Sequence, residues 1–279
     1  MIELDQYRER SLASWERLAE NWAREREFLW TNTEPVSRRL VERLGAQPGE
    51  TVLEIACGTG DTGFLVAREV GPDGRLIATD FSPEMLGRAR ENARAQGIDN
   101  AEFRTLDAEE MDLADDAVDR VVCRFGYMLM ADPLSALRET RRVLRDGGRL
   151  TFAVWADAGE NLWAAVPARE LVERGHVDPP QPGDPGIFAL ADPDHITVLL
   201  AQAGFHEHTI EQVPFMWRYV SPAEHWELTL RLAGPLADAL QELSEEERET
   251  VRSAVASRIG SLLERHGGVP ALSHVVTAA

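Results

Sequence analysis

The chain contains no lysine, so all 29 of its basic residues are arginines. Chemistry that forms a Schiff base on a lysine is therefore excluded. Cysteine is nearly absent as well, with only Cys57 and Cys123. Two cysteines cannot build a disulfide framework, and no nearby spacing completes a four-ligand zinc site. We therefore expect no metal, two buried thiols and a reducing compartment.

Positive charge is also scarce, since the formal net charge is −19 at pH 7. Such an acidic protein is repelled by nucleic acids and by anionic membranes, so we expect neither as a partner. No apolar run approaches the ~20 residues of a membrane span, and the N-terminus does not read as a signal peptide. The expected location is the cytoplasm, and the expected partner is a small molecule, with a homodimer as a possible assembly.

The most informative stretch is Thr51–Gly63, TVLEIACGTGDTG. Its first residues are apolar and partly β-branched, as in a strand buried on both faces of a parallel sheet. Gly58 and Gly60 then permit a tight turn and the close approach of a ligand to the backbone. Helical spacing of apolar residues follows, so this stretch predicts a strand, a glycine turn and a helix N-terminus, which together form a nucleotide pocket.

The ligand of this pocket has two interpretations. The spacing Gly58-x-Gly60-x-x-Gly63, with Asp80 20 residues beyond Gly60, matches the dinucleotide fingerprint and predicts NAD(P). A pyrophosphate, however, requires a helix N-terminus free of anions, and here Glu54 and Asp61 flank the turn. Two carboxylates suit a ligand with a ribose and positive charge but no phosphate. S-adenosylmethionine (SAM) has these properties.

The run from Val52 to Gly60, VLEIACGTG, resembles motif I of the class I SAM-dependent methyltransferases, and especially the ubiquinone/menaquinone-biosynthesis type of small-molecule methyltransferase. The resemblance implies methyl transfer from SAM to a small molecule by in-line displacement, with S-adenosylhomocysteine (SAH) as the product. An NAD(P)-dependent oxidoreductase and a SAM-binding protein without catalysis are the alternatives. The absence of a Tyr-x-x-x-Lys pair disfavours the first, and the sequence does not exclude the second.

The resemblance extends to the ends of the next strands. Asp80 stands where a carboxylate accepts both ribose hydroxyls, and Phe81 and Met85 follow in the family's second motif. Asp107 and Ala108 stand where the family binds adenine, although Asp107 also suits a cap or turn. Arg124 enters the loop that lies beneath the transferred methyl group. Together with motif I, the implied cofactor-binding residues are Trp22, Trp30, Glu54, Ala56, Gly58, Gly60, Asp80, Phe81, Met85, Asp107, Ala108 and Arg124.

Alternating strand and helix patterns predict an α/β protein with a Rossmann-like, mostly parallel sheet of seven strands, the last antiparallel. The expected strands begin at Thr51 and then cover 75–79, 101–106, 118–123, 149–155, 205–219 and 271–278. Ligands bind such sheets at the carboxyl ends of the strands. A helical insertion is expected over about 222–268, before the last strand.

The predicted organisation is one methyltransferase domain, 1–279. Residues 1–45 form a helical lid, with one helix over 5–30 and another over 35–44; residues 46–155 bind SAM, and 156–279 form the substrate side. Trp22 and Trp30 either pack the lid on the domain or face the cofactor. No acid–base pair is conspicuous, so the catalytic residues stay unknown. Candidates for contact with the substrate are Tyr127, His176, Trp217 and Tyr219, although a structural role is as good an explanation for Tyr127.

Overall fold

The computed structural model describes residues 4–181 and 183–279. Its centre is one seven-stranded sheet in the order β3-β2-β1-β4-β5-β7-β6. The strands are β1 Thr51–Ile55, β2 Arg75–Asp80, β3 Ala101–Thr105, β4 Val118–Arg124, β5 Leu144–Trp155, β6 His208–Trp217 and β7 Val269–Ala278. The first five pair in parallel, and β7 runs antiparallel to both β5 and β6. The predicted fold class is confirmed, with β5 beginning at Leu144 rather than Arg149.

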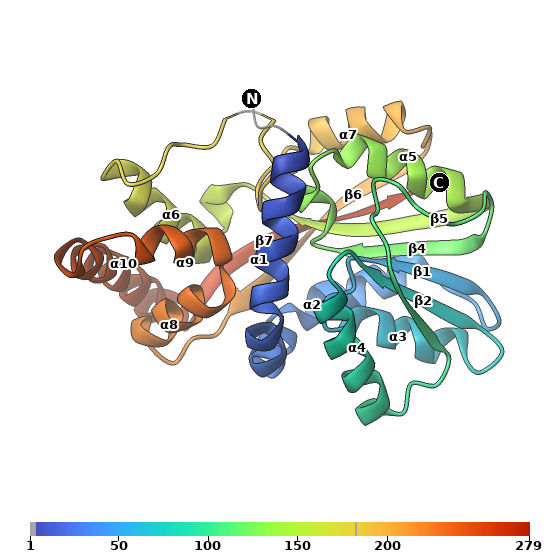
Figure 1. The fold of residues 1–279 in the computed structure, drawn as a ribbon, viewed down its shortest axis with the longest axis horizontal. Coiled ribbons are helices and arrows are strands. Elements are labelled where there is room, and N and C mark those ends of the chain that lie inside the picture. The colour runs from blue at the N-terminus through green and yellow to red at the C-terminus, as the bar shows by residue number, and fades with distance from the viewer. Residues whose placement is uncertain (1–3, 182) are drawn as a thin grey trace.

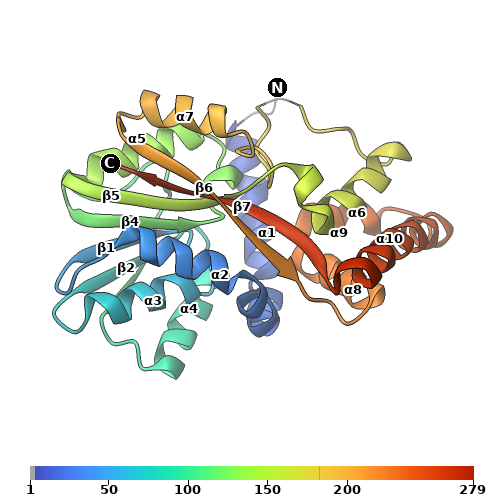
Figure 2. The same ribbon diagram turned by 180° about the vertical axis from the view of Figure 1, so that it is seen from behind.

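Ten α-helices surround the sheet in the described part of the chain: α1 Leu4–Arg24, α2 Arg26–Leu44, α3 Asp61–Val70, α4 Pro83–Gln96, α5 Pro133–Val143, α6 Leu162–Glu173, α7 Pro193–Gln202, α8 Pro222–Leu232, α9 Gly234–Gln241 and α10 Glu245–His266. Figures 1 and 2 show α2 and α3 on one face of the sheet and α5 on the other. The helices α6, α8, α9 and α10 gather beyond the carboxyl ends of the strands, and α1 crosses in front of that edge.

The two faces of the sheet bury separate apolar cores because neighbouring residues of a strand point in opposite directions. Leu53 and Phe152 pack with α5 and α7 in one core, whereas Val52 and Ala153 pack with α2, α3 and α4 in the other. Strands of this kind are apolar at nearly every position, as the sequence predicted for β1. The sheet is therefore held rigidly, and its carboxyl edge is a fixed platform.

The N-terminal helices differ from the expectation. The prediction of a single helix over 5–30 was wrong, because the helix is interrupted at Glu25. The next helix, α2, then continues through Pro35 to Leu44. The Glu25 carboxylate forms an ion pair with Arg231 of α8, with 2.6 Å between the nitrogen and the oxygen. Local helix propensity contains no information about this distant partner, so the position of the break could not be read from the sequence.

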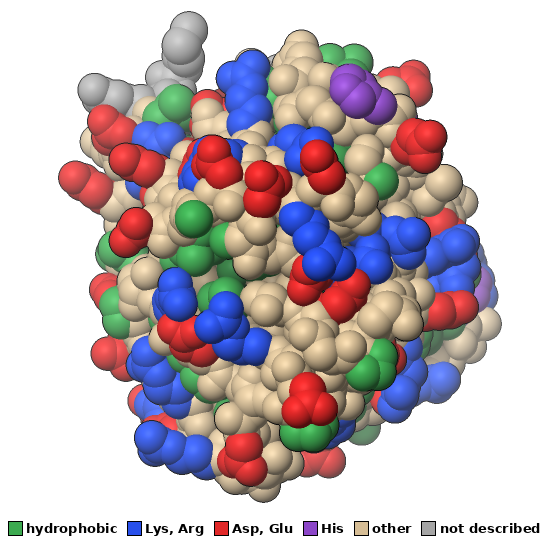
Figure 3. Space-filling model, turned by 90° about the vertical axis from the view of Figure 1, so that its right-hand side faces the viewer, with side chains coloured by type: hydrophobic (Ala, Val, Ile, Leu, Met, Phe, Trp, Pro, Cys, Tyr) green, Lys and Arg blue, Asp and Glu red, His purple; other side chains and the backbone are tan. Residues whose placement is uncertain are grey.

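The helical insertion expected over about 222–268 is confirmed as α8, α9 and α10, and α9 begins at Gly234. A capping box of Ser244 and Glu247 starts α10, with the Ser244 hydroxyl accepting from the Glu247 N–H. None of the described helices is long and apolar enough to cross a membrane. Figure 3 shows the face at the amino ends of the strands, where arginine and acidic side chains are interspersed.

Candidate functional site

The glycine turn after β1 is the base of the site. Gly58 and Gly60 both adopt positive φ, +54° and +88°. A Cβ on Gly60 would lie 2.3 Å from the Phe64 ring, whereas a Cβ on Gly58 would meet no atom within 4 Å. Gly60 is therefore required by packing, and Gly58 leaves open space above the backbone that a ligand can approach.

Gly63 has a different role from the one its spacing suggested. Its N–H donates to the Glu54 carboxyl at 2.8 Å, and a Cβ there would lie 2.0 Å from Glu54 Oε2. Glu54 is 2% exposed, and burial raises its pKa well above the usual range. The third glycine thus makes room for a buried carboxyl that occupies one of the free N–H groups at the start of α3.

Asp80 ends β2 beside this turn. One carboxylate oxygen accepts from the Gly58 N–H at 2.9 Å and the other from the Ser82 N–H at 3.0 Å. The side chain is 6% exposed, and burial raises its pKa to about 6 although these N–H groups act in the opposite direction. Each oxygen keeps a lone pair, so the carboxylate can still accept two hydroxyl groups.

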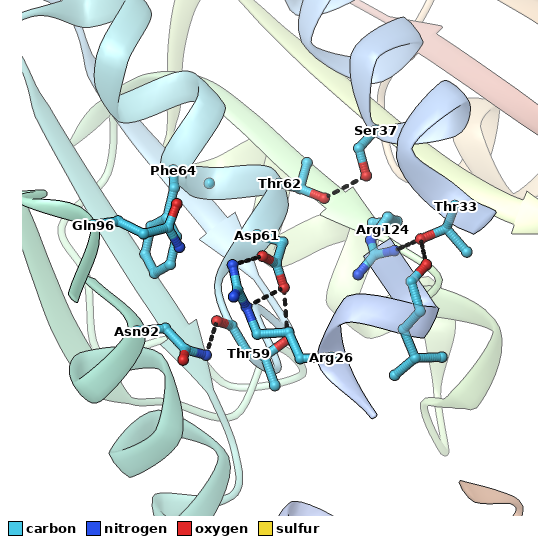
Figure 4. A network of polar contacts seen from close by, with 12 residues as sticks. Arg26, Thr33, Ser37, Thr59, Asp61, Thr62, Phe64, Asn92, Gln96 and Arg124 are labelled. Atoms are coloured by element: carbon cyan, nitrogen blue, oxygen red, sulfur yellow. Dashed lines mark hydrogen bonds and ion pairs between the residues drawn. The ribbon is translucent and has the colours of Figure 1, made fainter. Parts of the chain in front are cut away.

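The start of α2 is tied to the same turn, as Figure 4 shows. Arg26 pairs with Asp61, the first residue of α3, through Nε to Oδ2 at 3.2 Å and through a second, shorter contact. The Thr59 hydroxyl donates to the same carboxylate at 2.9 Å. Arg124, at the end of β4, donates to the Thr33 hydroxyl of α2 at 2.5 Å. Arg26 therefore holds α2 against the glycine turn, and Arg124 holds it against the end of β4.

Replacing Arg26 with methionine is expected to lower the free energy of unfolding by about 2 kcal/mol, because the buried Asp61 carboxylate loses its cation. Arg38→Met is the matched control, since Arg38 pairs with Glu34 on an exposed helix face and such pairs contribute about 0.5 kcal/mol or less. Urea denaturation of both variants measures the difference. Equal losses would contradict a special role for the Arg26–Asp61 pair.

Two non-glycine residues with positive φ border the site. Ala56 follows β1 with φ +53°, and Phe125 follows β4 with φ +61°. Between them a Cβ on Gly126 would lie 2.8 Å from the Ala56 Cβ, so the two turns pack directly on each other. Strained backbone of this kind concentrates at functional sites. Phe125 was not among the sequence candidates, since a φ angle leaves no signal in a single sequence.

Several predicted cofactor residues lie together at the carboxyl edge of β3-β2-β1-β4. Phe81 is half-buried next to Asp80, and the Leu106 N–H before Asp107 donates to the Asp80 carbonyl at 3.0 Å. Asp107 is exposed and accepts the Glu109 N–H at 2.9 Å, which is the turn-forming role considered above; Ala108 is buried. Glu54, Ala56, Gly58, Gly60 and Arg124 complete the group. All of these residues at the carboxyl edge of the sheet are proposed cofactor contacts.

The remaining predicted cofactor residues lie in helices. Met85 is buried at 1% exposure in the first turn of α4. Trp22 donates its indole N–H to the Leu232 carbonyl at 3.3 Å, so it joins α1 to α8, while Trp30 is half-buried in α2. This bond is consistent with a packing role for Trp22, and its contact with the cofactor stays a prediction.

The four candidates for contact with the substrate lie in three different parts of the molecule. Tyr127 is fully buried, and its hydroxyl lies 2.6 Å from that of Thr140 on α5, so its proposed contact with substrate is wrong. Tyr127 begins a short 3-10 helix, Tyr127–Leu129, and belongs to the apolar core rather than to the edge. His176 lies beside Glu247 at the outer start of α10. Trp217 and Tyr219 lie at and beyond the carboxyl end of β6.

Comparison with known proteins agrees with this geometry. Residues 46–173 match a family model described as a methyltransferase domain. The chain is 41% identical over 106 residues to an arsenite methyltransferase of Halobacterium salinarum, covering 38% of this chain and 27% of that protein. It is 34% identical over 113 residues to a demethylmenaquinone methyltransferase of Listeria monocytogenes, covering 40% and 48%. Each alignment thus spans less than half of the relative.

Among solved structures, a protein described as a putative methyltransferase from Bacillus halodurans superposes with a TM-score of 0.58 at 19% identity, covering 87% of this chain and 97% of the other. That similarity supports the fold over nearly the whole chain, and the sequence matches support the cofactor half. Residues 46–173, which contain motif I, are thus similar to methyltransferase domains.

Proposed function

We propose that the protein transfers a methyl group from SAM to a small-molecule acceptor. Within this proposal Gly58 gives the cofactor access to the backbone, Asp80 accepts the ribose hydroxyls, and Phe81 and Asp107 border the adenine. The N-terminal helices, residues 1–45, cover the cofactor, and residues 156–279 bind the acceptor. Two buried free cysteines favour a reducing, cytoplasmic setting.

The main observation in favour of SAM over a dinucleotide is that carboxyl groups occupy the N-terminus of α3. A pyrophosphate binds the free N–H groups of the first helical turn. Here Glu54 takes the Gly63 N–H, and Asp61 stands in the same turn with Arg26 and Thr59 bound to it. Both carboxyl groups occupy the place of a phosphate, so the geometry favours a ligand without one.

The main catalytic task of the protein is to align the acceptor with the methyl group of SAM. SAM supplies a methyl group on a positively charged sulfur, and no protein nucleophile is needed. Holding the acceptor in line with that methyl group can contribute ~7–11 kcal/mol to lowering the barrier. The rigid edge of β1, β4 and β5 provides one side of this alignment, and the start of α2 provides the cover that excludes water. Arg124, which is half-buried, balances the charge of Asp61 and Glu54 at the centre.

The cofactor assignment predicts a specific stabilisation. SAH at a hundred times its dissociation constant should stabilise the fold by about 2.7 kcal/mol, because it binds only the native state, whereas NAD(H) should have no effect. Thermal denaturation with each ligand measures this. Stabilisation by NAD(H) and none by SAH would overturn the proposal. Binding of SAH without any methyl transfer to a broad panel of acceptors would support a non-catalytic SAM-binding protein instead.

A further inference from the structure

The outer strand of the sheet, β6, has one free edge. It pairs with β7 on one side and has no second neighbour in the described sheet. In Figure 2, α7 lies above β6 and α2 below it, and no helix crosses in front of the strand. An unpaired edge offers backbone hydrogen-bonding groups to an incoming strand, so the question is which strand can bind here.

The register with β7 identifies the backbone groups that face this free edge. Glu207 and Ala279 exchange both backbone hydrogen bonds, with N to O distances of 3.4 and 2.9 Å. Such pairs alternate in an antiparallel ladder, so the odd-numbered residues of β6 bond to β7 and the even-numbered residues direct N–H and C=O outward. In the described part of the chain, these outward groups of His208, Ile210 and Gln212 have no backbone partner.

Pro214 limits the length of the free edge. It is an even-numbered residue of β6, so the N–H that proline lacks is one that would have pointed outward. Prolines in sheets are confined to such edge positions. An incoming strand that paired across Pro214 would lose a hydrogen bond there. The part of the edge that can pair fully is therefore 208–212.

The two faces of β6 carry different side chains, because successive residues alternate between them. Glu211 binds Arg39 and Arg43 of α2 at 2.7 Å each, so the odd-numbered residues lie on the α2 face. His208 Nε2 lies 3.1 Å from the Thr197 hydroxyl of α7, so the even-numbered residues lie on the α7 face. On the α2 face, a groove of about 310 Å³ runs beside the edge and is lined by Pro35, Arg38, Arg39, Glu42 and 211–214.

A second copy of β6 fits this edge in one antiparallel register. With a two-fold axis at Ile210, Glu207 lies opposite Val213 of the second copy, and Thr209 lies opposite Glu211. An axis at Thr209 would place Glu207 opposite Glu211, and an axis at Glu211 would place that residue opposite itself. Like charges directly opposite each other destabilise a strand pair. Charge therefore selects the axis at Ile210.

The same register gives the two copies complementary charges. Glu207 is exposed and lies on the α2 face. Opposite Val213 of the second copy, its carboxylate reaches the groove that Arg38 and Arg39 line. The Arg38 side chain is 65% exposed, so it is accessible there. The net charge of −19 opposes association of two copies in general, and the two symmetric contacts of Glu207 with arginine offset this repulsion locally.

We propose that two copies of the chain form a dimer by pairing their β6 strands antiparallel about a two-fold axis at Ile210. His208, Ile210 and Gln212 of each copy exchange backbone hydrogen bonds with Gln212, Ile210 and His208 of the other, and both sheets become one. Such an interface uses the same surface of both subunits. Since β5 and β6 are both antiparallel to β7, the carboxyl edges of the two copies face opposite directions. The dimer thus leaves both proposed cofactor sites uncovered and does not rest on the proposed function.

The first test is sedimentation equilibrium of the full chain at concentrations up to about 1 mM, which should show a dimer. Gln212→Pro removes an outward N–H and no bond to β7, and the symmetric interface loses two hydrogen bonds. It should weaken the dimer about tenfold to a hundredfold. Gln212→Ala is the matched control, because it keeps the N–H of an exposed residue and should leave dimerisation unchanged. A monomer at every concentration, or a dimer that Gln212→Pro does not weaken in a folded protein, would overturn the proposal. The first result would leave the edge to a strand of another protein.

Amide hydrogen exchange tests the register. The amides of Ile210 and Gln212 should become protected as the dimer forms, whereas the outward amide of Met216, beyond Pro214, should stay unprotected. Equal protection of Met216 would contradict the register.

A charge exchange tests the groove and does not depend on a proline. Glu207→Arg should weaken the dimer about tenfold, and Arg38→Glu in the same chain should restore most of the affinity. If Gln212→Pro does not fold, a dimer that is indifferent to Glu207→Arg refutes the interface.

Discussion

Replacing Asp80 with alanine is expected to weaken SAM binding by about a hundredfold or more. Two ribose hydroxyls on one carboxylate form charge-assisted hydrogen bonds, each contributing ~1.5–3 kcal/mol. Calorimetric titration with SAM measures the loss. The control is Asp99→Ala, which removes an exposed carboxylate and should leave the affinity unchanged. Wild-type affinity in a folded Asp80→Ala protein would show that Asp80 is not the ribose ligand.

The same carboxylate gives SAM binding a pH dependence. Burial raises the pKa of Asp80 to about 6 from its usual value of 3.8. The ligand requires the ionised form, so the affinity should be constant above about pH 7 and should fall about tenfold for each unit below pH 6. For the ligand-free fold the sign is opposite: the raised pKa contributes stability fully below about pH 3.8, and this contribution is lost as the pH rises through 6. An affinity for SAM that does not change between pH 5 and 7 would contradict this assignment.

Replacing Gly60 with alanine is expected to have the largest effect on stability. The new Cβ would lie 2.3 Å from the Phe64 ring, which is fully buried, at a backbone φ of +88°. Overpacking and left-handed strain together should lower the free energy of unfolding by about 2–4 kcal/mol. Urea denaturation measures this change directly.

Gly58→Ala is the matched comparison two residues earlier. Its φ is +54°, but its Cβ would enter open space, so the loss of stability should be only about 1–2 kcal/mol. The methyl group would instead occupy the space proposed for the cofactor, and SAM affinity should fall at least about tenfold. If Gly58→Ala binds SAM normally, the cofactor does not approach the backbone at this turn.

The sequence was sufficient for the centre of the sheet because β1 and β2 are buried at nearly every position, and several helices begin with a capping residue. Ser82 accepts the Met85 N–H at the start of α4, and Asp192 accepts the Asp194 N–H at the start of α7. Strand ends in a parallel sheet lie at one edge, so Gly58, Asp80 and Arg124 could be grouped without coordinates.

The parts that sequence reasoning missed depend on contacts between distant segments or on backbone angles. Phe125 has a positive φ and Tyr127, two residues later, is buried in the core, and the sequence pattern indicated neither. Trp22 satisfies its indole on α8, a helix about two hundred residues later in the chain. Helical periodicity reports that a residue is on an apolar face, but it does not report which element covers that face.

The position of β7 has a consequence for the order in which the protein folds. This strand, Val269–Ala278, lies between β5 and β6, and β6 has no other neighbour in the described sheet. During synthesis the strands β1 to β4 are complete long before β6 has anything to pair with. Trp217, at the end of β6, reaches its place only after the last strand has been inserted. The nascent chain therefore assembles the cofactor half first, and until then β5 exposes an unpaired edge that a chaperone or a second chain can bind.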